Sequence, residues 1–255
     1  MSRPRPPAGP AAPARWPGGG DPAWTPEPAD LEWALGQAHH RSWAVGAALF
    51  TAARPPTGLF LLRTGFVQLS VPGPAGDERL LAVVGPPCLA GDPGPVFGQP
   101  PAPVTATCIT PCEAAFWPYA HFRTMIAERP GLAAVLAYQG MLVYHQALQR
   151  VAGLMWPCSR LRVLHTLLVL TRTFSRNEPG PGCRFPPSLT QAGLGHAANA
   201  SRVTVNRVLA DLRRRGIVAR SRPLHIRQPD RLEALLKEEL GALPLRERRH
   251  RGGGR

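Results

Sequence analysis

Apolar residues between Trp43 and Pro118 fall into short runs that Gly and Pro residues separate. The runs read AVGAALFTA, GLFLLRTGFVQLSV, RLLAVVG, VTATCIT and EAAFW, and the intervening PGPAGDE is typical of a hairpin turn. Short strands at regular intervals predict a sandwich or a roll of β-strands over this part of the chain. Ahead of it, we expect Asp30 to cap a short helix with the sequence LEWALGQAHH.

Beyond Pro118 the apolar positions take a helical period. The pattern predicts a short helix over Tyr119–Glu128 and a long helix over 130–156, with Pro130 in its first turn. The long helix carries two apolar stripes, one made of Leu132, Val135, Leu136, Leu142 and Val143, the other of Met141, Tyr144, Leu148, Val151 and Met155. A helix that is apolar on two sides packs against two partners. The β-roll supplies one; a second subunit or the rest of the same monomer supplies the other.

The stretch from Leu189 to Val218 has the pattern of a helix-turn-helix. Thr190 is a suitable N-cap for a helix over 191–198, and Asn199 suits the sharp turn that follows. We expect Ser201 to cap a second helix over 202–215 that ends at Gly216. Its buried stripe is Val205, Val208, Leu209 and Leu212, and its outward residues are Ser201, Arg202, Asn206, Arg207 and Arg213. The pattern alone also allows an ordinary helical hairpin with a solvated basic face.

The segments around this motif complete the second half of the chain. Pro157 breaks the long helix, and the pattern predicts a helix over 159–174 and a strand over 183–185. A basic hairpin wing is expected over 217–227, and Asp230 with Glu233 resembles a capping box for a last helix. The predicted domains are a disordered Pro-rich segment 1–28, a sensor-like β-roll 29–129, a dimerisation helix 130–156, a winged helix-turn-helix 157–228, and a C-terminal helix with a basic tail 229–255.

Positive charge is concentrated in the second half of the chain. From Pro157 onward there are 20 Lys and Arg against 7 Asp and Glu, a net charge of +13, whereas residues 1–156 hold 10 against 9, a net charge of +1. Such asymmetry favours a nucleic-acid-binding half. The sequence shows no apolar run long enough to span a membrane and no signal-peptide pattern, so we expect no membrane association and a cytoplasmic location.

The five cysteines and the eight histidines of the chain give little sign of catalysis. No C-x-x-C, H-E-x-x-H or Gly-rich phosphate loop occurs, and no nucleophile stands beside an evident base, so the sequence predicts a protein that is not an enzyme and binds no metal. Inert buried thiols are the default for a cytosolic protein. A metal or redox pair at Cys108 and Cys112 is the alternative.

The helix-turn-helix resembles that of the Crp/Fnr transcription regulators. The matching residues are Ser201-Arg202-x-Thr204-Val205-x-Arg207-x-Leu209, followed by Leu212 and Gly216-Ile217. The run from Phe60 to Leu69, with Gly65 inside it, resembles the strand–glycine–strand signature of the cyclic-nucleotide-binding β-roll. The resemblance implies an α+β fold with an N-terminal β-roll (a double-stranded jelly roll), a long dimerisation helix and a C-terminal winged helix-turn-helix. It also implies a homodimer that binds double-stranded DNA and contacts RNA polymerase.

Candidate DNA contacts follow from the residue types on the second helix. Arg202 and Arg207 suit guanine edges, and Val203 can offer only an apolar contact, for instance to a thymine methyl group. Candidate phosphate contacts are Thr190, Gln191, Ser201 and Thr204, and Asn206 shares the outward face. Residues 154–235 are most similar to the cyanobacterial global nitrogen regulators, which implies a half-site of the GTA type. A non-specific basic nucleic-acid-binding or architectural protein is the alternative function.

The effector is not evident from the sequence. Family members that bind cyclic AMP carry Gly-Glu and, further along, an arginine followed by Ser or Thr; this chain has Gly91-Asp92 and, at 101–105, no arginine. A buried phosphate without a cation is costly. The members that bind 2-oxoglutarate use an arginine in the same region and polar residues on the dimer helix, where this chain has Val143, Tyr144, His145 and Ala147. Neither effector is therefore supported, and none is assigned.

Overall fold

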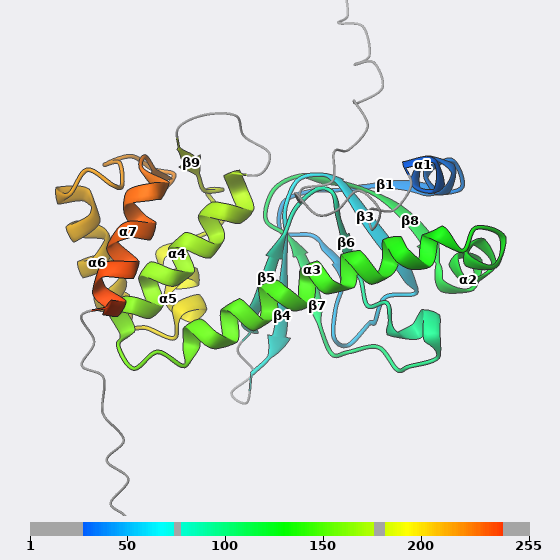
Figure 1. Cartoon of the computed structure of the whole chain (residues 1–255), viewed down its shortest axis with the longest axis horizontal. Helices are drawn as coiled ribbons and strands as arrows, with labels where there is room; N and C mark the ends of the chain where they lie inside the picture. Colours follow the sequence, from blue (N-terminus) through cyan, green and yellow to red (C-terminus); the bar gives the residue numbers. More distant parts are fainter. Residues whose placement is uncertain (1–27, 74–77, 176–181, 242–255) are drawn as a thin grey trace, which may run out of the picture. The chain divides into compact units, whose positions relative to one another are not determined.

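A computed structural model of the chain describes residues 28–73, 78–175 and 182–241. The chain divides into two compact units, residues 1–150 and residues 151–255. The division falls inside helix α3, Gly131–Leu154 (Figure 1). The Pro-rich segment and the basic tail lie outside the described residues, except that helix α1 begins at Pro28.

The first unit, over its described residues, contains two four-stranded antiparallel sheets. One has the order β1-β8-β3-β6, with β1 His39–Trp43, β8 Cys112–Pro118, β3 Gly58–Thr64 and β6 Cys88–Ala90. The other has the order β2-β7-β4-β5, with β2 Ala48–Phe50, β7 Thr105–Cys108, β4 Val67–Pro72 and β5 Glu78–Val84. This arrangement confirms the predicted β-roll. A short 3-10 helix, η2 (Gly94–Phe97), follows β6.

Two features of the first unit differ from the sequence prediction. Strands β1 and β6 were not expected, because the exposed polar sequence HHRSW and the three residues CLA lack a strand pattern. Helix α1 spans Pro28–Gly36, so Asp30 lies inside its first turn and does not cap it. The predicted end of that helix, His39 and His40, belongs to β1. Pairing with β8 is what draws these histidines into a strand.

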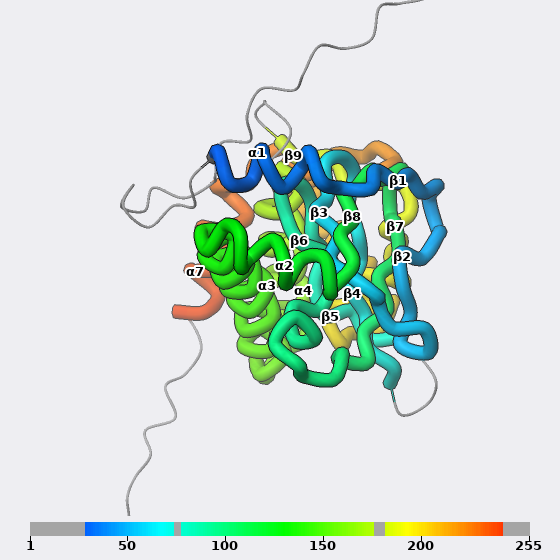
Figure 2. Tube along the Cα trace, turned by 90° about the vertical axis from the view of Figure 1, so that its right-hand side faces the viewer, coloured from blue at the N-terminus to red at the C-terminus, as the bar shows by residue number. Residues whose placement is uncertain are grey.

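Strand β3 separates two apolar clusters because its side chains alternate between the faces of the sheet. Phe60 and Leu62 point into the space between the sheets, where the Phe60 and Phe116 rings lie 4.8 Å apart. Leu59 and Leu61 join a second cluster with α1, with α2 (Tyr119–Glu128) and with the start of α3. In Figure 2, β3 and β8 accordingly lie between α2 and the strands β7 and β2. Burial on both faces explains the continuous apolar run of β3.

Gly65 carries the chain from β3 in one sheet to β4 in the other. Its φ is +81°, a conformation that favours glycine, and an added Cβ would lie 2.1 Å from the carbonyl oxygen of Pro111. The glycine of the predicted strand–glycine–strand signature is therefore required both by the backbone conformation and by close packing. The predicted hairpin between Pro72 and Glu78 joins β4 to β5, which are paired, although residues 74–77 lie outside the described part.

Helix α3 buries one of its two predicted apolar stripes and exposes the other. Leu132, Val135 and Leu136 are buried against α1, α2 and the β3 sheet. The second stripe is exposed, by 55% at Met141, 63% at Tyr144, 46% at Leu148 and 51% at Val151. Side chains as apolar as these rarely stay in water as one continuous face, so a partner surface is expected there.

The second unit is a helical cluster with a small sheet. Helix α4 is largely buried and contacts the three helices that follow it. The elements are α4 Ser159–Ser175, β9 Cys183–Arg184, α5 Gln191–Ala198, α6 Arg202–Arg214, β10 His225–Ile226 and α7 Pro229–Gly241. Strands β9 and β10 pair, and a bridge joins Val218 to Ile226, which confirms the predicted wing.

The expected capping box of the last helix is wrong. Helix α7 begins at Pro229, so Asp230 lies within its first turn. Glu233 does not turn back to the helix start; its carboxylate pairs with Arg172 at 2.8 Å and with Lys237 at 2.8 Å. The hydrogen bond from Lys237, the largest single cause, and the hydrogen bond and charge of Arg172 lower the pKa of Glu233. Proline in the first turn starts this helix.

Candidate nucleic-acid interface

The turn between α5 and α6 is built by local hydrogen bonds that the sequence predicted. The Thr190 hydroxyl accepts from the Gly193 N–H at 3.1 Å, and the Ser201 hydroxyl accepts from the Thr204 N–H at 3.2 Å. Asn199 takes a left-handed conformation with φ +45°. An added Cβ on Gly195 would lie 2.9 Å from the Ala200 carbonyl oxygen, so the turn itself requires a small residue there.

Helix α6 has one fully buried face and one exposed face. Val205, Val208, Leu209 and Leu212 are each at most 2% exposed, as the periodicity predicted. The exposed side chains near the helix start are Arg202, Val203, Asn206 and Arg207, together with the cap Ser201. Thr204 is half-buried, and its hydroxyl lies 3.0 Å from that of Ser201. Thr190, exposed, and Gln191, half-buried, lie at the start of α5.

Arg162 of α4 fixes the turn from below, and the sequence reasoning did not identify it. Its Nε donates to the Ala198 carbonyl at 3.1 Å, and its Nη2 donates to the Asn199 carbonyl at 2.9 Å. A third bond runs from Nη1 to the Trp156 carbonyl at 2.9 Å. A guanidinium thus satisfies the carbonyls at the end of α5, where a cation is also favoured by the helix dipole.

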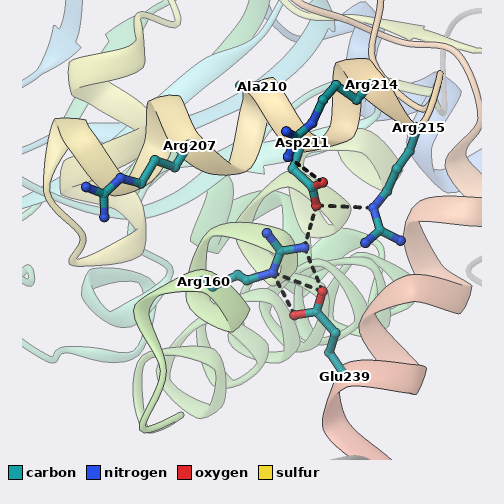
Figure 3. A pocket seen from close by; sticks show the side chains of 7 residues that line it. All are labelled: Arg160, Arg207, Ala210, Asp211, Arg214, Arg215 and Glu239. Atoms are coloured by element: carbon teal, nitrogen blue, oxygen red, sulfur yellow. Dashed lines mark hydrogen bonds and ion pairs between the residues drawn. The ribbon is translucent and has the colours of Figure 1, made fainter.

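A charged cleft of about 670 Å³ lies behind α6, and an ion-pair network holds its walls together (Figure 3). Arg160 of α4 donates from Nη2 to Asp211 at 2.7 Å and to Glu239 of α7 at 2.7 Å; its Nε bonds both oxygens of Glu239 at 2.9 Å. Asp211 also accepts from Arg214 and Arg215 at 3.2 Å each. We call these five side chains the Arg160 network. The hydrogen bond from Arg160 is the main cause of the lowered pKa of Asp211.

The Arg160 network lies on the side of α6 that faces its neighbouring helices. Its members come from α4, α6 and α7, so the network fixes α6 to both neighbours. Arg207 lines the same cleft but points away from the network, which leaves its guanidinium directed outward (Figure 3). The sequence could not place Arg160 opposite Glu239, because 79 residues separate them.

In the first unit, the loop after β6 is held by the side chain of Asp92. One carboxylate oxygen accepts from the Gly94 N–H at 2.8 Å, and the other accepts from the Ala102 N–H at 2.6 Å. The Tyr119 hydroxyl donates to the Asp92 carbonyl at 2.9 Å. Burial, with a smaller contribution from the Asp92 charge, raises the pKa of Tyr119 to about 12. The carboxylate therefore serves to hold its own loop.

Beside this loop lies a cavity of about 240 Å³ between the β3 sheet and helix α3. Its walls are Leu59, Leu89, Gly91, Pro93, Leu136, Gln139, Gly140, Val143 and Tyr144. None of these described residues is charged. His145, which lies on the same helix, is exposed, and its Nε2 lies 2.7 Å from Nε2 of Gln149.

Cys108 and Cys112 do come together at the end of the roll. Both are buried, and they share a hydrogen bond that lowers the pKa of Cys112 to about 7 and raises the pKa of Cys108. Over the described residues no cluster of three or more His, Cys, Asp or Glu side chains has the geometry to hold a metal ion. The described helices include none that is both long and apolar enough to cross a membrane.

Comparison with known proteins places both units in one family. Residues 161–235 match the model of the Crp-like helix-turn-helix domain, and residues 40–129 match that of the cyclic nucleotide-binding domain. A CRP-like cAMP-activated global transcriptional regulator of Mycobacterium tuberculosis is 30% identical over 171 residues, which cover 67% of this chain and 75% of the relative. The chain belongs to the Crp/Fnr family of transcription regulators.

Other relatives of this Crp/Fnr regulator agree with the assignment. The global nitrogen regulator of Synechococcus elongatus is 27% identical over 175 residues, covering 68% of this chain and 78% of the relative. Among solved structures, FixK2 from Bradyrhizobium japonicum has a TM-score of 0.65 at 18% identity and covers 78% of this chain and 96% of its own. The c-di-GMP responsive regulator CLP from Xanthomonas campestris has a TM-score of 0.64 at 18% identity, with coverages of 78% and 98%. These two likenesses confirm the fold.

The first unit of this Crp/Fnr regulator matches the cyclic nucleotide-binding domain, and the described residues that line its cavity beside α3 are uncharged. The cavity beside α3 offers no described cation for a phosphate, and burying a phosphate without one is costly. The acidic group that follows Gly91 already bonds two backbone N–H groups of its own loop.

Proposed function

We propose that the protein is a dimeric, sequence-specific regulator of transcription that inserts helix α6 into the major groove of double-stranded DNA. The observation that carries the proposal is the exposed start of α6, where guanidinium, amide, hydroxyl and apolar groups stand side by side on a helix whose opposite face is buried. The hydrogen bonds of Arg162 to the turn and of the Arg160 network to α6 hold this exposed surface in place. Rigid presentation is what direct readout of base edges requires.

Roles for the individual side chains follow from their chemistry. Arg202 and Arg207 are proposed to donate to guanine O6 and N7, and Val203, 58% exposed, to contact a thymine methyl group. Asn206 lies between the arginines on the exposed face. The groups proposed to bond phosphates, which position the helix without reading sequence, are Thr190, Gln191, Ser201 and Thr204. The Ser201 and Thr204 hydroxyls bond each other at 3.0 Å, so one of the two protons is used in that bond and the other hydroxyl can donate to a phosphate.

Dimerisation is proposed to occur through the exposed stripe of α3. Met141, Tyr144, Leu148 and Val151 form an apolar face on a long helix, the kind of surface that a second copy of the same helix can cover. A two-fold dimer presents two recognition helices, so the operator is expected to be an inverted repeat with half-sites about 34 Å apart. Likeness to the global nitrogen regulator favours a GTA-type half-site.

The regulator is proposed not to respond to cyclic AMP or to 2-oxoglutarate, because neither anion finds a cation in the cavity beside α3. We further propose that it contacts RNA polymerase, acts in the cytoplasm, and has no catalytic role. These points extend to this chain what is usual for bacterial transcription regulators with this fold. The relative from Mycobacterium tuberculosis is named as cAMP-activated. The two proteins are therefore proposed to differ in their effector and to bind DNA through the same kind of helix.

The experiment is selection of bound sequences from random duplex DNA by the full chain without added ligand, repeated with cyclic AMP and with 2-oxoglutarate. Recovery of one inverted repeat in all three conditions is the expected result. Enrichment of no sequence, with an affinity that falls steeply as salt rises, would instead show a non-specific basic DNA-binding protein. A repeat recovered only with one of the two ligands would refute the effector proposal.

Arg202→Ala tests the assignment of α6 within the same assay. Loss of a bidentate contact is expected to cost about 1–3 kcal/mol of specific binding and to relax base choice at one position of each half-site. Arg231→Ala is the matched control, because Arg231 is an exposed arginine on α7 whose hydrogen bond is to Gln228. If Arg202→Ala weakened binding to every sequence equally, Arg202 would be a phosphate contact.

A further inference from the structure

The cavity beside α3 has walls that favour an uncharged ligand. The aliphatic side chains in its lining are Leu59, Leu89, Leu136 and Val143, and Gly91 and Gly140 leave it open where a side chain would otherwise project. An added Cβ on Gly140 would meet no atom within 4 Å. The whole lining lies in the first unit. A charged molecule entering such a space would lose its hydration without gaining a counter-charge.

The polar groups that line the cavity are neutral and oriented. Gln139 is fully buried; its Oε1 accepts from the Leu89 N–H at 3.1 Å, and its Nε2 donates to the Pro87 carbonyl at 3.3 Å. A primary amide has a second N–H and a second lone pair, so one donor and one acceptor remain for a further partner. Tyr144, 63% exposed, adds a hydroxyl group at the rim.

The size of the cavity limits the ligand. An apolar cavity of about 150 Å³ in another protein holds benzene. The 240 Å³ available here suits a molecule of one or two rings, or a branched aliphatic molecule of similar bulk. Tyr144 also belongs to the exposed stripe of α3, so a molecule in this cavity contacts the helix through which the dimer is proposed to form.

We propose that this cavity binds a small, uncharged, mainly apolar molecule, which one hydrogen bond to the Gln139 amide orients, and that this molecule is the effector of the regulator. The effector part rests on the proposed function as a DNA-binding regulator, whereas the binding part does not. Contacts with Leu59 and Leu89 on one side and with Leu136 and Val143 on the other join the β-roll to α3. Occupancy therefore stabilises the position of α3 on the roll.

The binding part is tested by calorimetry on the full chain with three uncharged probes, indole, p-cresol and cyclohexanol. Indole-3-acetate and cyclic AMP are the charged comparisons. At least one uncharged probe is expected to bind saturably, with one molecule per chain, and indole-3-acetate is expected to bind about ten-fold more weakly than indole. Failure of all three uncharged probes, or tighter binding of cyclic AMP than of any of them, overturns the proposal.

Variants of Gly140 locate the binding. Gly140→Leu places a side chain in the cavity and is expected to raise the Kd of the bound probe at least about ten-fold. Gly140→Ala, which favours the helix and fills little space, should keep the affinity within about two-fold and shows that the position tolerates substitution. Gly36→Leu is the matched control, because Gly36 is a helical glycine outside the cavity with nothing within 4 Å of its Cβ. An unchanged Kd in Gly140→Leu overturns the proposed site.

The effector part is tested separately by DNA binding to the selected operator with and without the probe that binds. A change in operator affinity that Gly140→Leu abolishes supports it, and an unchanged affinity overturns it while the binding site stands. If the chain selects no operator, the proposed function fails instead, and the calorimetric result for the cavity is unaffected.

Discussion

Removing the carboxylate at the centre of the Arg160 network is expected to destabilise the second unit measurably. Asp211 is 16% exposed and bonds Arg160 at 2.7 Å, a partner 31% exposed. A charge-assisted hydrogen bond contributes about 1.5–3 kcal/mol, and the lower end applies because Arg160 keeps Glu239 in the variant. The pairs with Arg214 and Arg215, whose side chains are 76% and 48% exposed, add about 0.3 kcal/mol each. We therefore expect Asp211→Ala to lower the free energy of unfolding by about 2 kcal/mol.

The partner variant should cost more than Asp211→Ala. Arg160→Ala leaves Asp211 and Glu239 facing each other without the cation that joins them, so the loss is expected to reach about 3 kcal/mol. The double variant Arg160→Ala/Asp211→Ala should then cost less than the sum of the single changes, because the interaction is counted once. Additive losses would show that the two side chains do not stabilise the unit through each other.

The pH dependence gives an independent check on the same carboxylate. The pKa of Asp211 is lowered in the folded protein, chiefly by Arg160, so its stabilising effect is complete above the ordinary aspartate pKa of about 3.9. It is lost as the pH falls through the lowered folded value. Urea unfolding should therefore give a constant difference between the native chain and Asp211→Asn from about pH 5 to pH 7, and a shrinking one below about pH 4. A difference below about 0.5 kcal/mol at pH 7, or one that grows on acidification, would refute the reasoning.

Two further predictions concern the first unit and helix α3. Leu148→Arg places a charge on the exposed stripe, so light scattering should show a monomer in place of the dimer. Gln146→Arg, on the opposite side of the helix, should leave the dimer intact. A native chain that is already monomeric would contradict the proposed interface. Tyr119→Phe removes the hydrogen bond to Asp92 and should lower stability by about 1 kcal/mol. It should also remove the phenolate absorbance that appears near pH 12 in alkaline titration of the native chain, and an unchanged titration would show that Tyr119 is not the group concerned.

The helix-turn-helix could be predicted almost residue by residue because its signals are local. The caps Thr190 and Ser201 act within three residues, and the buried stripe of α6 repeats every three or four. Asn199 was recognisable because few residues other than glycine accept a positive φ. The one difference is that α6 ends at Arg214, with Arg215 as its C-cap. The β-roll was predictable as a class for the same reason, since glycine and turn residues divide its strands.

The parts that could not be predicted depend on residues far apart in the chain. Arg160 meets Asp211 across 51 residues, and Arg162 reaches the Asn199 carbonyl across 37. Strand β1 has an exposed polar sequence and owes its conformation to pairing with β8, more than sixty residues later. The domain boundaries and the DNA contacts stay predictions. The cavity also required three-dimensional packing, because Gln139 bonds Leu89 across 50 residues.

The difference between local signals and contacts across the chain also decides which properties of the family can be transferred to this protein. The chemistry proposed to read DNA resides in one short segment, where Arg202, Thr204, Val205 and Arg207 match the family pattern; Val205 is buried, and the two arginines are exposed. The proposed effector site depends instead on how a loop, a sheet and α3 meet, and its described lining residues are uncharged. The carboxylate of Asp92, beside this cavity, bonds Gly94 and Ala102 of its own loop. Because a fold fixes where a ligand binds but not which ligand, the effector must be inferred from the lining of the cavity.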